Sequence, residues 1–238
     1  MNTTQNTILI TGSSSGIGEQ CAKTCLEDGY QVIGLARDFT KSPLEHPNYH
    51  TLVCDLNKPD HIEKTIKSII KQYRPNQFLH SAGFGRFGSL EQFSTTQIHQ
   101  LIQVNLISGI LISRLLLPNL RKADNAKMIF IGSESALTVG KKGAVYCASK
   151  FGLRGFVQSL REDCSSDDIG VSLINPGMVD SPFFNDLDFR PADNENCSIK
   201  PADIAKIVLF SLSMQNNVIL DEINCSPAVK SIDFCKKA

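Results

Sequence analysis

A glycine-rich turn near the N-terminus constrains the fold of this chain more than any other feature. Residues 7–11 form an apolar, β-branched run that predicts a buried strand. The turn follows directly over residues 12–18 (Gly-Ser-Ser-Ser-Gly-Ile-Gly), and a helical pattern comes next. A strand, a glycine turn and a helix in this order set a pyrophosphate on the helix N-terminus. We therefore predict a dinucleotide site, in which Gly12 allows the tight turn, Gly16 lets the phosphates approach and Gly18 lets the helix pack on the sheet.

Strand-like apolar runs alternate with helical patterns along the whole chain. The predicted strands are residues 7–11, 31–36, 50–54, 77–81, 127–132, 170–174 and 217–220. The predicted helices are residues 16–28, 59–73, 95–122, 145–165 and 201–214. This alternation predicts an α/β fold, a doubly wound parallel sheet (Rossmann fold) of about seven strands with helices on both faces. We expect residues 1–238 to form a single domain, in which the irregular segment 182–200 is a substrate loop or lid.

Composition limits the classes of partner. Lys plus Arg equal Asp plus Glu at 24 each, so the chain has no net field that would attract nucleic acid. The longest apolar stretch, residues 106–117, is too short to span a bilayer and contains Arg114. The N-terminus shows no secretory signal, and the eight cysteines form no Cys-x-x-Cys pair and no cluster with histidine. We therefore expect a cytoplasmic protein that binds a small molecule, without a metal, a membrane or nucleic acid.

A second group of residues can carry proton-transfer chemistry. Tyr146 and Lys150 are four residues apart, so they lie one turn apart on the same face of a predicted helix. Ser133 ends a predicted buried strand. A tyrosine titrates near ~10, and a cation held close to the phenol lowers that pKa. A hydroxyl, a phenol and an ammonium that converge in this way can move a proton to or from a carbonyl oxygen at neutral pH.

Taken together, these features resemble the short-chain dehydrogenase/reductase family, in its single-domain type with a Tyr-x-x-x-Lys active site. The similarity runs from about Thr7 to Ser181 and continues more faintly to the C-terminus. The matching motifs are residues 11–18, Asp55-Leu56, Ser81-Ala82-Gly83, Asn105, Ser133, Tyr146-Cys147-Ala148-Ser149-Lys150 and Asn175-Pro176-Gly177-Met178-Val179-Asp180-Ser181.

The resemblance implies a catalytic tetrad of Asn105, Ser133, Tyr146 and Lys150. Tyr146 would transfer the proton and Ser133 would orient the reacting oxygen. Lys150 would bind the cofactor ribose and lower the phenol pKa, and Asn105 would kink its helix and hold a water that relays protons to the lysine. The resemblance also implies a cofactor site made of Gly12, Ser14, Ser15, Gly16, Ile17, Gly18, Arg37, Asp55, Leu56, Ser81, Ala82, Gly83, Tyr146, Lys150, Pro176, Gly177, Val179 and Ser181. Ser81 stands where the family usually has Asn, which puts its structural role in question.

The end of the second predicted strand bears on the choice of cofactor. NAD sites place a carboxylate there for the ribose hydroxyls, but this chain has Ala36 at the aligned position. Arg37 follows, and a guanidinium suits a 2′-phosphate. We predict NADP; the alternative is a solvated Arg37 with Asp38 contacting the ribose, which would mean NAD. The implied activity is an NADP(H)-dependent oxidoreductase that interconverts a carbonyl and a secondary alcohol.

Three other functions remain open. A cofactor-binding regulator without turnover is disfavoured by the complete tetrad, and an NAD-dependent dehydrogenase depends on Asp38. A family isomerase, dehydratase or epimerase usually has a longer substrate domain than this chain allows.

The substrate pocket and the assembly are predicted from position alone. The expected pocket is largely apolar and is formed by Phe84, Gly85, Phe87, Ser135, Ala136, Leu137, Met178, Phe183 and Phe184. The predicted helix 95–122 has an apolar stripe wider than one face against a sheet requires, which predicts a homodimer or homotetramer. The stripe consists of Ile98, Leu101, Ile102, Leu106, Ile110, Leu111 and Leu115.

Overall fold

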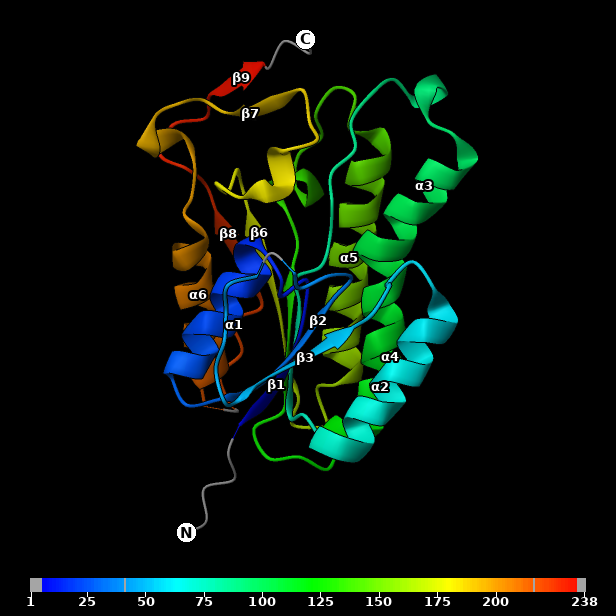
Figure 1. The fold of residues 1–238 in the computed structure, drawn as a ribbon, viewed down its shortest axis with the longest axis vertical. Helices are drawn as coiled ribbons and strands as arrows, with labels where there is room; N and C mark the ends of the chain where they lie inside the picture. The colour runs from blue at the N-terminus through cyan, green and yellow to red at the C-terminus, as the bar shows by residue number, and fades with distance from the viewer. Residues whose placement is uncertain (1–5, 41, 216, 235–238) are drawn as a thin grey trace.

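The structure, a computed structural model, describes residues 6–40, 42–215 and 217–234. Its centre is a seven-stranded parallel sheet in the order β3-β2-β1-β4-β5-β6-β8 (Figure 1). The strands are β1 (Thr7–Thr11), β2 (Gln31–Ala36), β3 (Tyr49–Val53), β4 (Gln77–His80), β5 (Lys127–Ile131), β6 (Gly170–Pro176) and β8 (Glu222–Cys225). The helices are α1 (Gly16–Glu27), α2 (Pro59–Tyr73), α3 (Thr95–Ile102), α4 (Ser108–Leu120), α5 (Ala144–Asp163) and α6 (Pro201–Ser213). The predicted doubly wound fold is confirmed.

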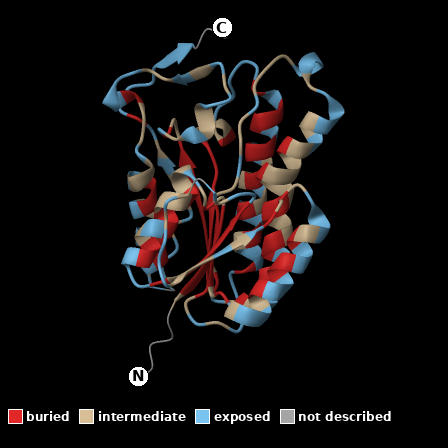
Figure 2. Ribbon diagram, viewed as in Figure 1, coloured by how far each residue is buried: buried red, intermediate tan, exposed pale blue. Residues whose placement is uncertain are grey.

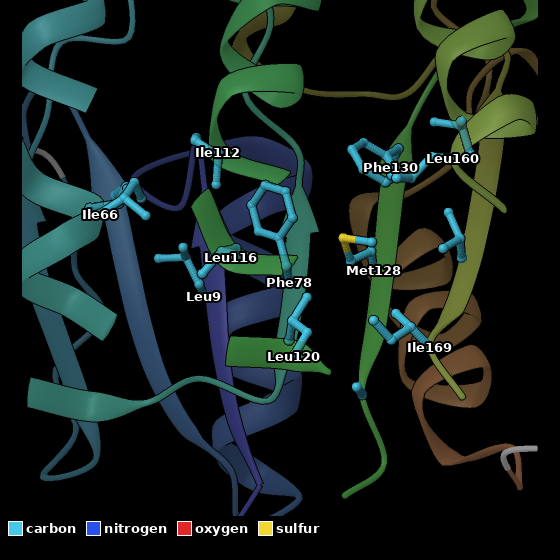
Figure 3. Packing of buried hydrophobic residues seen from close by; sticks show 14 of the residues in the cluster. Leu9, Ile66, Phe78, Ile112, Leu116, Leu120, Met128, Phe130, Leu160 and Ile169 are labelled. Atoms are coloured by element: carbon cyan, nitrogen blue, oxygen red, sulfur yellow. The ribbon is translucent and has the colours of Figure 1, made fainter. Parts of the chain in front are cut away.

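Helices cover both faces of the sheet because the strands are apolar on both sides. Figure 1 shows α1 and α6 on one face and α2, α4 and α5 on the other. Burial concentrates on the strands and on the helix faces turned toward them (Figure 2). One core cluster lies under α2, α4 and α5, where the fully buried rings of Phe78 and Phe130 meet edge to face at 5.9 Å between centroids (Figure 3). A second cluster lies under α1 and α6.

The last strand of the sheet differs from the prediction. Residues 217–220 are not a strand, and β8 begins at Glu222, opposite Leu173 of β6. The apolar residues Val218 and Ile219 suggested a buried strand, but they are 45% and 39% exposed. The strand that pairs alternates polar and apolar side chains. Glu222 and Asn224 accept hydrogen bonds from Asn175 of β6, while Ile223 and Cys225 pack against the second core cluster. Two apolar residues are too few for a sequence pattern to mark this edge strand.

Two short strands that were not predicted lie within irregular regions. β7 (Phe189–Pro191) pairs antiparallel with β9 (Ile232–Phe234), so the substrate-loop segment and the C-terminal segment lie side by side, apart from the main sheet (Figure 1). Each has three residues, which is too short for an alternating pattern to be visible. Short 3₁₀ turns cover Leu90–Gln92, Glu134–Ala136, Pro182–Phe184 and Glu195–Cys197.

The predicted helix 95–122 is interrupted by a π-helical segment, Gln103–Ile107, between α3 and α4. By length and composition alone, the run from Thr95 to Leu120 could cross a membrane. Leu101, Ile112 and Leu116 along it are fully buried against the rest of the protein, so we interpret it as a core helix.

Candidate active site

The predicted site residues gather at one edge of the sheet. The glycine turn follows β1, Arg37 follows β2, and Asp55-Leu56 come after β3. Residues 81–83 follow β4, and residues 177–181 follow β6. All these strands are parallel, so their carboxyl ends lie at the same edge. The order in which strands are added to the sheet reverses between β1 and β4, and such a switch point is where open α/β sheets bind ligands.

The glycine turn is packed too closely for larger residues. A Cβ atom on Gly12 would lie 2.9 Å from Ala82 Cα, and one on Gly18 would lie 2.3 Å from the Gly12 carbonyl oxygen. Gly12 and Gly16 also adopt left-handed φ angles of 72° and 58°, which favour glycine. Between them lie the half-buried Ser14 and the exposed Ser15, which is the N-cap of α1 and leads into Ile17. The turn thus presents the N-terminus of α1, where backbone N–H groups and the helix dipole favour an anion.

Thr11 and His80, two residues not predicted for the site, connect this turn to the strand beside it. The Thr11 hydroxyl oxygen accepts hydrogen bonds from the backbone N–H groups of Ser81 and Ala82, both at 3.2 Å, and lies 3.0 Å from His80 Nδ1. Burial, with a smaller effect of the nearby Lys150 charge, lowers the pKa of His80 to about 3, so the imidazole is neutral. The Thr11 hydroxyl oxygen already accepts two hydrogen bonds, so this hydroxyl is the donor in the hydrogen bond to His80 Nδ1. Thr11 thus holds Ser81 and Ala82 through their backbone N–H groups, so this link does not depend on the Ser81 side chain.

Helix α5 and strand β5 bring three of the predicted catalytic side chains together. Tyr146, Lys150 and Ser133 are 6%, 5% and 9% exposed. The Lys150 ammonium lies 5.9 Å from the centre of the Tyr146 ring and donates a hydrogen bond to the Ile131 carbonyl oxygen at 3.1 Å. The Ser133 hydroxyl accepts one from the backbone N–H of Ser135 at 3.1 Å and is hydrogen-bonded to the Tyr146 side chain.

The electrostatics correct one expectation about Tyr146. Burial raises the pKa of its phenol to about 12, and the hydrogen bond with Ser133 opposes this rise. The ammonium of Lys150 was expected to lower that pKa, but it is directed at a backbone carbonyl, and burial lowers the pKa of Lys150 itself to about 8. Desolvation of the two buried groups therefore changes their pKa values more than the attraction between the ammonium and the phenolate does. A sequence pattern does not show this desolvation.

Asn105 lies in the π-helical segment, where its side chain pairs with the backbone of one residue. Its Oδ1 accepts from the Phe84 N–H at 3.0 Å, and its Nδ2 donates to the Phe84 carbonyl at 2.9 Å. A Cβ atom on Gly83 would lie 3.3 Å from Asn105 Oδ1 and 3.7 Å from Lys150 Nζ, so this glycine keeps the two side chains accessible to each other. The resemblance implied that Asn105 kinks its helix, and the π-helical segment interrupts the helix at this residue. Such π-bulges are frequent at functional sites. Its role in a water relay stays a prediction.

The structure also places the residues that were predicted to contact the adenosine part of the cofactor. Arg37 and Asp38 are both exposed, and both carboxylate oxygens of Asp38 accept hydrogen bonds from Thr40, at 2.8 and 2.9 Å. Asp55 accepts from the backbone N–H of Asn57 at 3.0 Å, and Leu56 is buried.

The segment after β6 contains the remaining residues that were predicted for the cofactor site. A Cβ atom on Gly177, which follows Pro176, would lie 2.9 Å from Pro227 Cδ. Val179 is buried, and the Ser181 hydroxyl donates to its carbonyl at 3.3 Å.

Aromatic rings close over the tyrosine. Phe87 and Phe183 contact the Tyr146 ring at 5.1 and 6.0 Å between centroids. Phe189 of β7 contacts Phe87 at 5.0 Å and Phe184 at 5.9 Å. Phe87, Phe183, Phe184 and Phe189, which we call the aromatic cap, therefore shield the phenol from solvent.

A cavity beside the aromatic cap differs from the apolar pocket that was expected. It has a volume of about 700 Å³, and its walls are mostly polar. Its lining includes Asp180, Ser181, Phe184, Arg190, Asp193 and Glu195. Of the predicted pocket residues only Phe184 contributes, because Phe87 and Phe183 pack onto Tyr146 instead.

Comparisons with known proteins identify the family and the fold of the chain. A family model described as short chain dehydrogenase matches residues 6–190. An uncharacterized oxidoreductase of Staphylococcus epidermidis is 26% identical over 224 residues, which is 92% of this chain and 96% of the relative. A metagenomic short-chain oxidoreductase solved with NADP has a TM-score of 0.79 at 26% identity, covering 94% of this chain and 98% of that one. An alcohol dehydrogenase of the archaeon Thermococcus sibiricus, solved with 5-hydroxy-NADP, has a TM-score of 0.82 at 23% identity, covering 93% and 96%.

Proposed function

Because this chain belongs to the short-chain dehydrogenase family of oxidoreductases, we propose that it interconverts a carbonyl and a secondary alcohol on a small substrate with NADP(H). The observation that carries the proposal is the convergence of Ser133, Tyr146 and Lys150 beside a glycine turn at the carboxyl edge of the sheet. Transfer of deuterium from labelled NADPH to the carbon of a carbonyl substrate tests it.

The glycine turn fits a dinucleotide. The absence of Cβ atoms at Gly12 and Gly18 lets the backbone pack closely. Gly16 faces Ser181: a Cβ atom placed on this glycine would lie 3.4 Å from the serine Cβ. A diphosphate would be held between this turn and Ser181, the adenine would lie beside Asp55 and Leu56, and Lys150 would hold the ribose next to the nicotinamide. Among the described residues, no group of three or more His, Cys, Asp or Glu could hold a metal ion.

The protein's own groups handle the proton. The bound nicotinamide would supply or accept the hydride. Tyr146 Oη holds the proton that the substrate oxygen gains or loses, and Ser133 Oγ hydrogen-bonds that oxygen and fixes its position. Lys150 places its positive charge behind the phenol, where it stabilises the phenolate that forms as the proton leaves.

Tyr146 is protonated at neutral pH, because burial raises the pKa of its phenol to about 12. It can therefore donate a proton to a carbonyl oxygen in the reductive direction, and oxidation of an alcohol requires the phenolate.

The pH dependence of reduction should report Lys150. Burial places its pKa at about 8, so the lysine is charged below that pH and neutral above it. The charge is needed to stabilise the phenolate, so kcat/KM for carbonyl reduction with NADPH should be level below about pH 8 and fall above it. A Lys150→Met variant, slow at every pH, should lack this inflection. A wild-type profile that rises with pH through this range would contradict the assignment.

Two observations support NADP over NAD. Arg37 is exposed at the end of β2 and forms none of the ion pairs found among the described residues, so its guanidinium is available for a phosphate. Asp38, the alternative ribose ligand, has both carboxylate oxygens engaged by Thr40. The metagenomic short-chain oxidoreductase and the Thermococcus alcohol dehydrogenase, which this chain resembles, were solved with NADP and with 5-hydroxy-NADP.

Arg37→Ala should weaken NADPH binding and leave NADH binding almost unchanged. A hydrogen bond to a charged group contributes roughly 1.5–3 kcal/mol, or about ten- to a hundredfold in the dissociation constant. Calorimetric titration of both cofactors measures the effect, with Arg74→Ala, on the turn after α2, as a control for general loss of positive charge. An equal loss for both cofactors would indicate a structural role for Arg37, and a wild-type preference for NADH would overturn the choice of NADP.

We propose that residues 182–200 act as a substrate lid. They contribute Phe183, Phe184 and Phe189 to the aromatic cap, and β7 within them is bound to β9 near the C-terminus. A substrate that reaches the Tyr146 hydroxyl has to displace Phe183, because the tyrosine is almost completely buried beneath it. The C-terminal strand then holds the lid at its outer end.

We further propose a homodimer or homotetramer in a reducing compartment, the cytoplasm. Of the seven residues in the predicted stripe only Leu101 is buried, and Phe151 on the neighbouring α5 is 41% exposed, so an apolar face is left for a second subunit. The seven cysteines among the described residues are free thiols. Light scattering at micromolar concentration should give a multiple of the 26.1 kDa chain mass; a monomer with full activity would rule the oligomer out.

A further inference from the structure

A buried amide lies directly behind the predicted catalytic serine. The Ser133 backbone N–H donates a hydrogen bond to Asn175 Oδ1 at 3.3 Å, and Asn175 is 1% exposed. A Cβ atom on Gly132 would lie 2.0 Å from the same Oδ1, so the glycine before Ser133 leaves the space that this amide fills. The position of the serine backbone thus depends on how the Asn175 side chain is held.

Glu222 fixes the orientation of that amide. Asn175 Nδ2 donates to Glu222 Oε1 at 2.9 Å and to Asn224 Oδ1 at 2.9 Å. An ionised carboxylate can only accept hydrogen bonds, so the NH₂ end of the amide has to face Glu222. The oxygen end therefore faces the N–H of Ser133.

Arg154 connects the same carboxylate to the helix that carries the other catalytic groups. Its Nε lies 3.0 Å from Glu222 Oε1 and donates to Oε2 at 3.1 Å. Arg154 follows Lys150 by four residues on α5, so both lie on one side of that helix. The Glu222 side chain is only 17% exposed, which limits screening of the pair by solvent.

We propose that Arg154, Glu222 and Asn175 form a positioning unit that holds Ser133 in register with Tyr146 and Lys150. The inference rests on the proposed function, because it assigns these residues to the same reaction. Glu222 is the central residue of the unit. Its carboxylate pairs with Arg154 of α5 and accepts a hydrogen bond from Asn175, and Asn175 in turn accepts one from the backbone N–H of Ser133. None of the three needs to contact the substrate, because they act through the position of the serine hydroxyl.

The first test compares Glu222→Ala with Asp221→Asn. The control, Asp221→Asn, weakens a neighbouring ion pair between α5 and the same edge of the sheet. In this pair Arg161 Nε lies 3.3 Å from Asp221 Oδ1, and Asn175 takes no part in it. Glu222→Ala should lower kcat about tenfold, since a charge-assisted hydrogen bond that orders the site is lost. NADPH affinity should stay within a few-fold, and Asp221→Asn should retain wild-type kcat. Wild-type kcat in Glu222→Ala, or an equal loss in both variants, would overturn the proposal.

The second test asks whether Glu222 acts through Ser133. In a Ser133→Ala background the serine hydroxyl is already missing, so adding Glu222→Ala should lower kcat little further. Multiplicative losses would show that Glu222 supports the protein in general and would overturn the proposal. If Glu222→Ala does not fold, Glu222→Gln replaces it in the same test, with a smaller expected loss of kcat. A loss is still expected because an amide can donate as well as accept, so it no longer dictates which end of the Asn175 amide faces it.

Hydrogen exchange of the Ser133 amide separates this inference from the proposed function. Exchange should be faster in Glu222→Ala than in the wild type and unchanged in Asp221→Asn. If the wild type turned over no carbonyl, the proposed function would fail, and this measurement would still test the positioning unit. Unchanged exchange at Ser133 in Glu222→Ala would overturn it.

Discussion

Tyr146→Phe should remove turnover while leaving the cofactor site intact. The phenylalanine ring preserves the contacts with Phe87 and Phe183, so the aromatic cap keeps its packing. Only the hydroxyl that holds the proton is lost, and proton transfer by a positioned side chain contributes roughly 10²–10⁴-fold to the rate. We expect kcat to fall by that factor, measured from the loss of NADPH absorbance, and the NADPH dissociation constant to change little.

Tyr73→Phe is the matched control. Tyr73 is half-buried at the end of α2, away from the site, so removal of its hydroxyl should leave kcat unchanged. Turnover of Tyr146→Phe within a few-fold of the wild type would remove this residue from the chemistry.

Gly18→Ala should abolish cofactor binding. The new Cβ would lie 2.3 Å from the Gly12 carbonyl oxygen, a contact that real Cβ atoms do not make, so the glycine turn has to move away from the N-terminus of α1. That N-terminus is where the phosphates are expected, and we expect at least a hundredfold loss of NADPH affinity, about 2.7 kcal/mol.

Gly155→Ala provides the control for this substitution. Gly155 is also helical, but it is exposed on α5, and a Cβ there would have no neighbour within 4 Å. The change should raise the stability by roughly 0.5–1 kcal/mol, the intrinsic preference of a helix for Ala over Gly, and leave NADPH binding as it is. Isothermal titration and thermal melting of both variants measure the effects. Normal affinity in Gly18→Ala would mean that the turn does not hold the cofactor.

The sequence predicted the main sheet closely wherever apolar side chains decide the structure. Strands such as Val32–Leu35 and Phe78–Leu79 are buried on both faces, so an unbroken apolar run marks them. The prediction failed at β8, whose Glu222 and Asn224 are held by polar contacts with Asn175. Such contacts come from segments distant in the chain and leave no local pattern.

The site was predictable to the extent that its residues lie in compact motifs. The Tyr-x-x-x-Lys spacing and the glycine turn located Tyr146, Lys150 and Gly18 at one edge of the sheet. Thr11 was part of the quoted motif, but its link to His80 requires two neighbouring parallel strands to be in register. The raised pKa of Tyr146 depends on burial by an aromatic cap assembled from separate segments, which no spacing reveals.

The central claim, hydride transfer from NADPH to a carbonyl, can be tested with a labelled cofactor. The wild-type protein is incubated with NADPH carrying deuterium at the pro-R or the pro-S position of the nicotinamide C4, together with a panel of aldehydes, ketones and aldoses. Mass spectrometry then follows deuterium in the products, and Tyr146→Phe serves as the negative control. The account predicts that one of the two labelled cofactors, and not the other, places deuterium on the carbinol carbon of a product alcohol. Tight binding of NADPH with no deuterium in any product, and no reduction of NADP by the corresponding alcohols, would contradict it and indicate a cofactor-binding regulator.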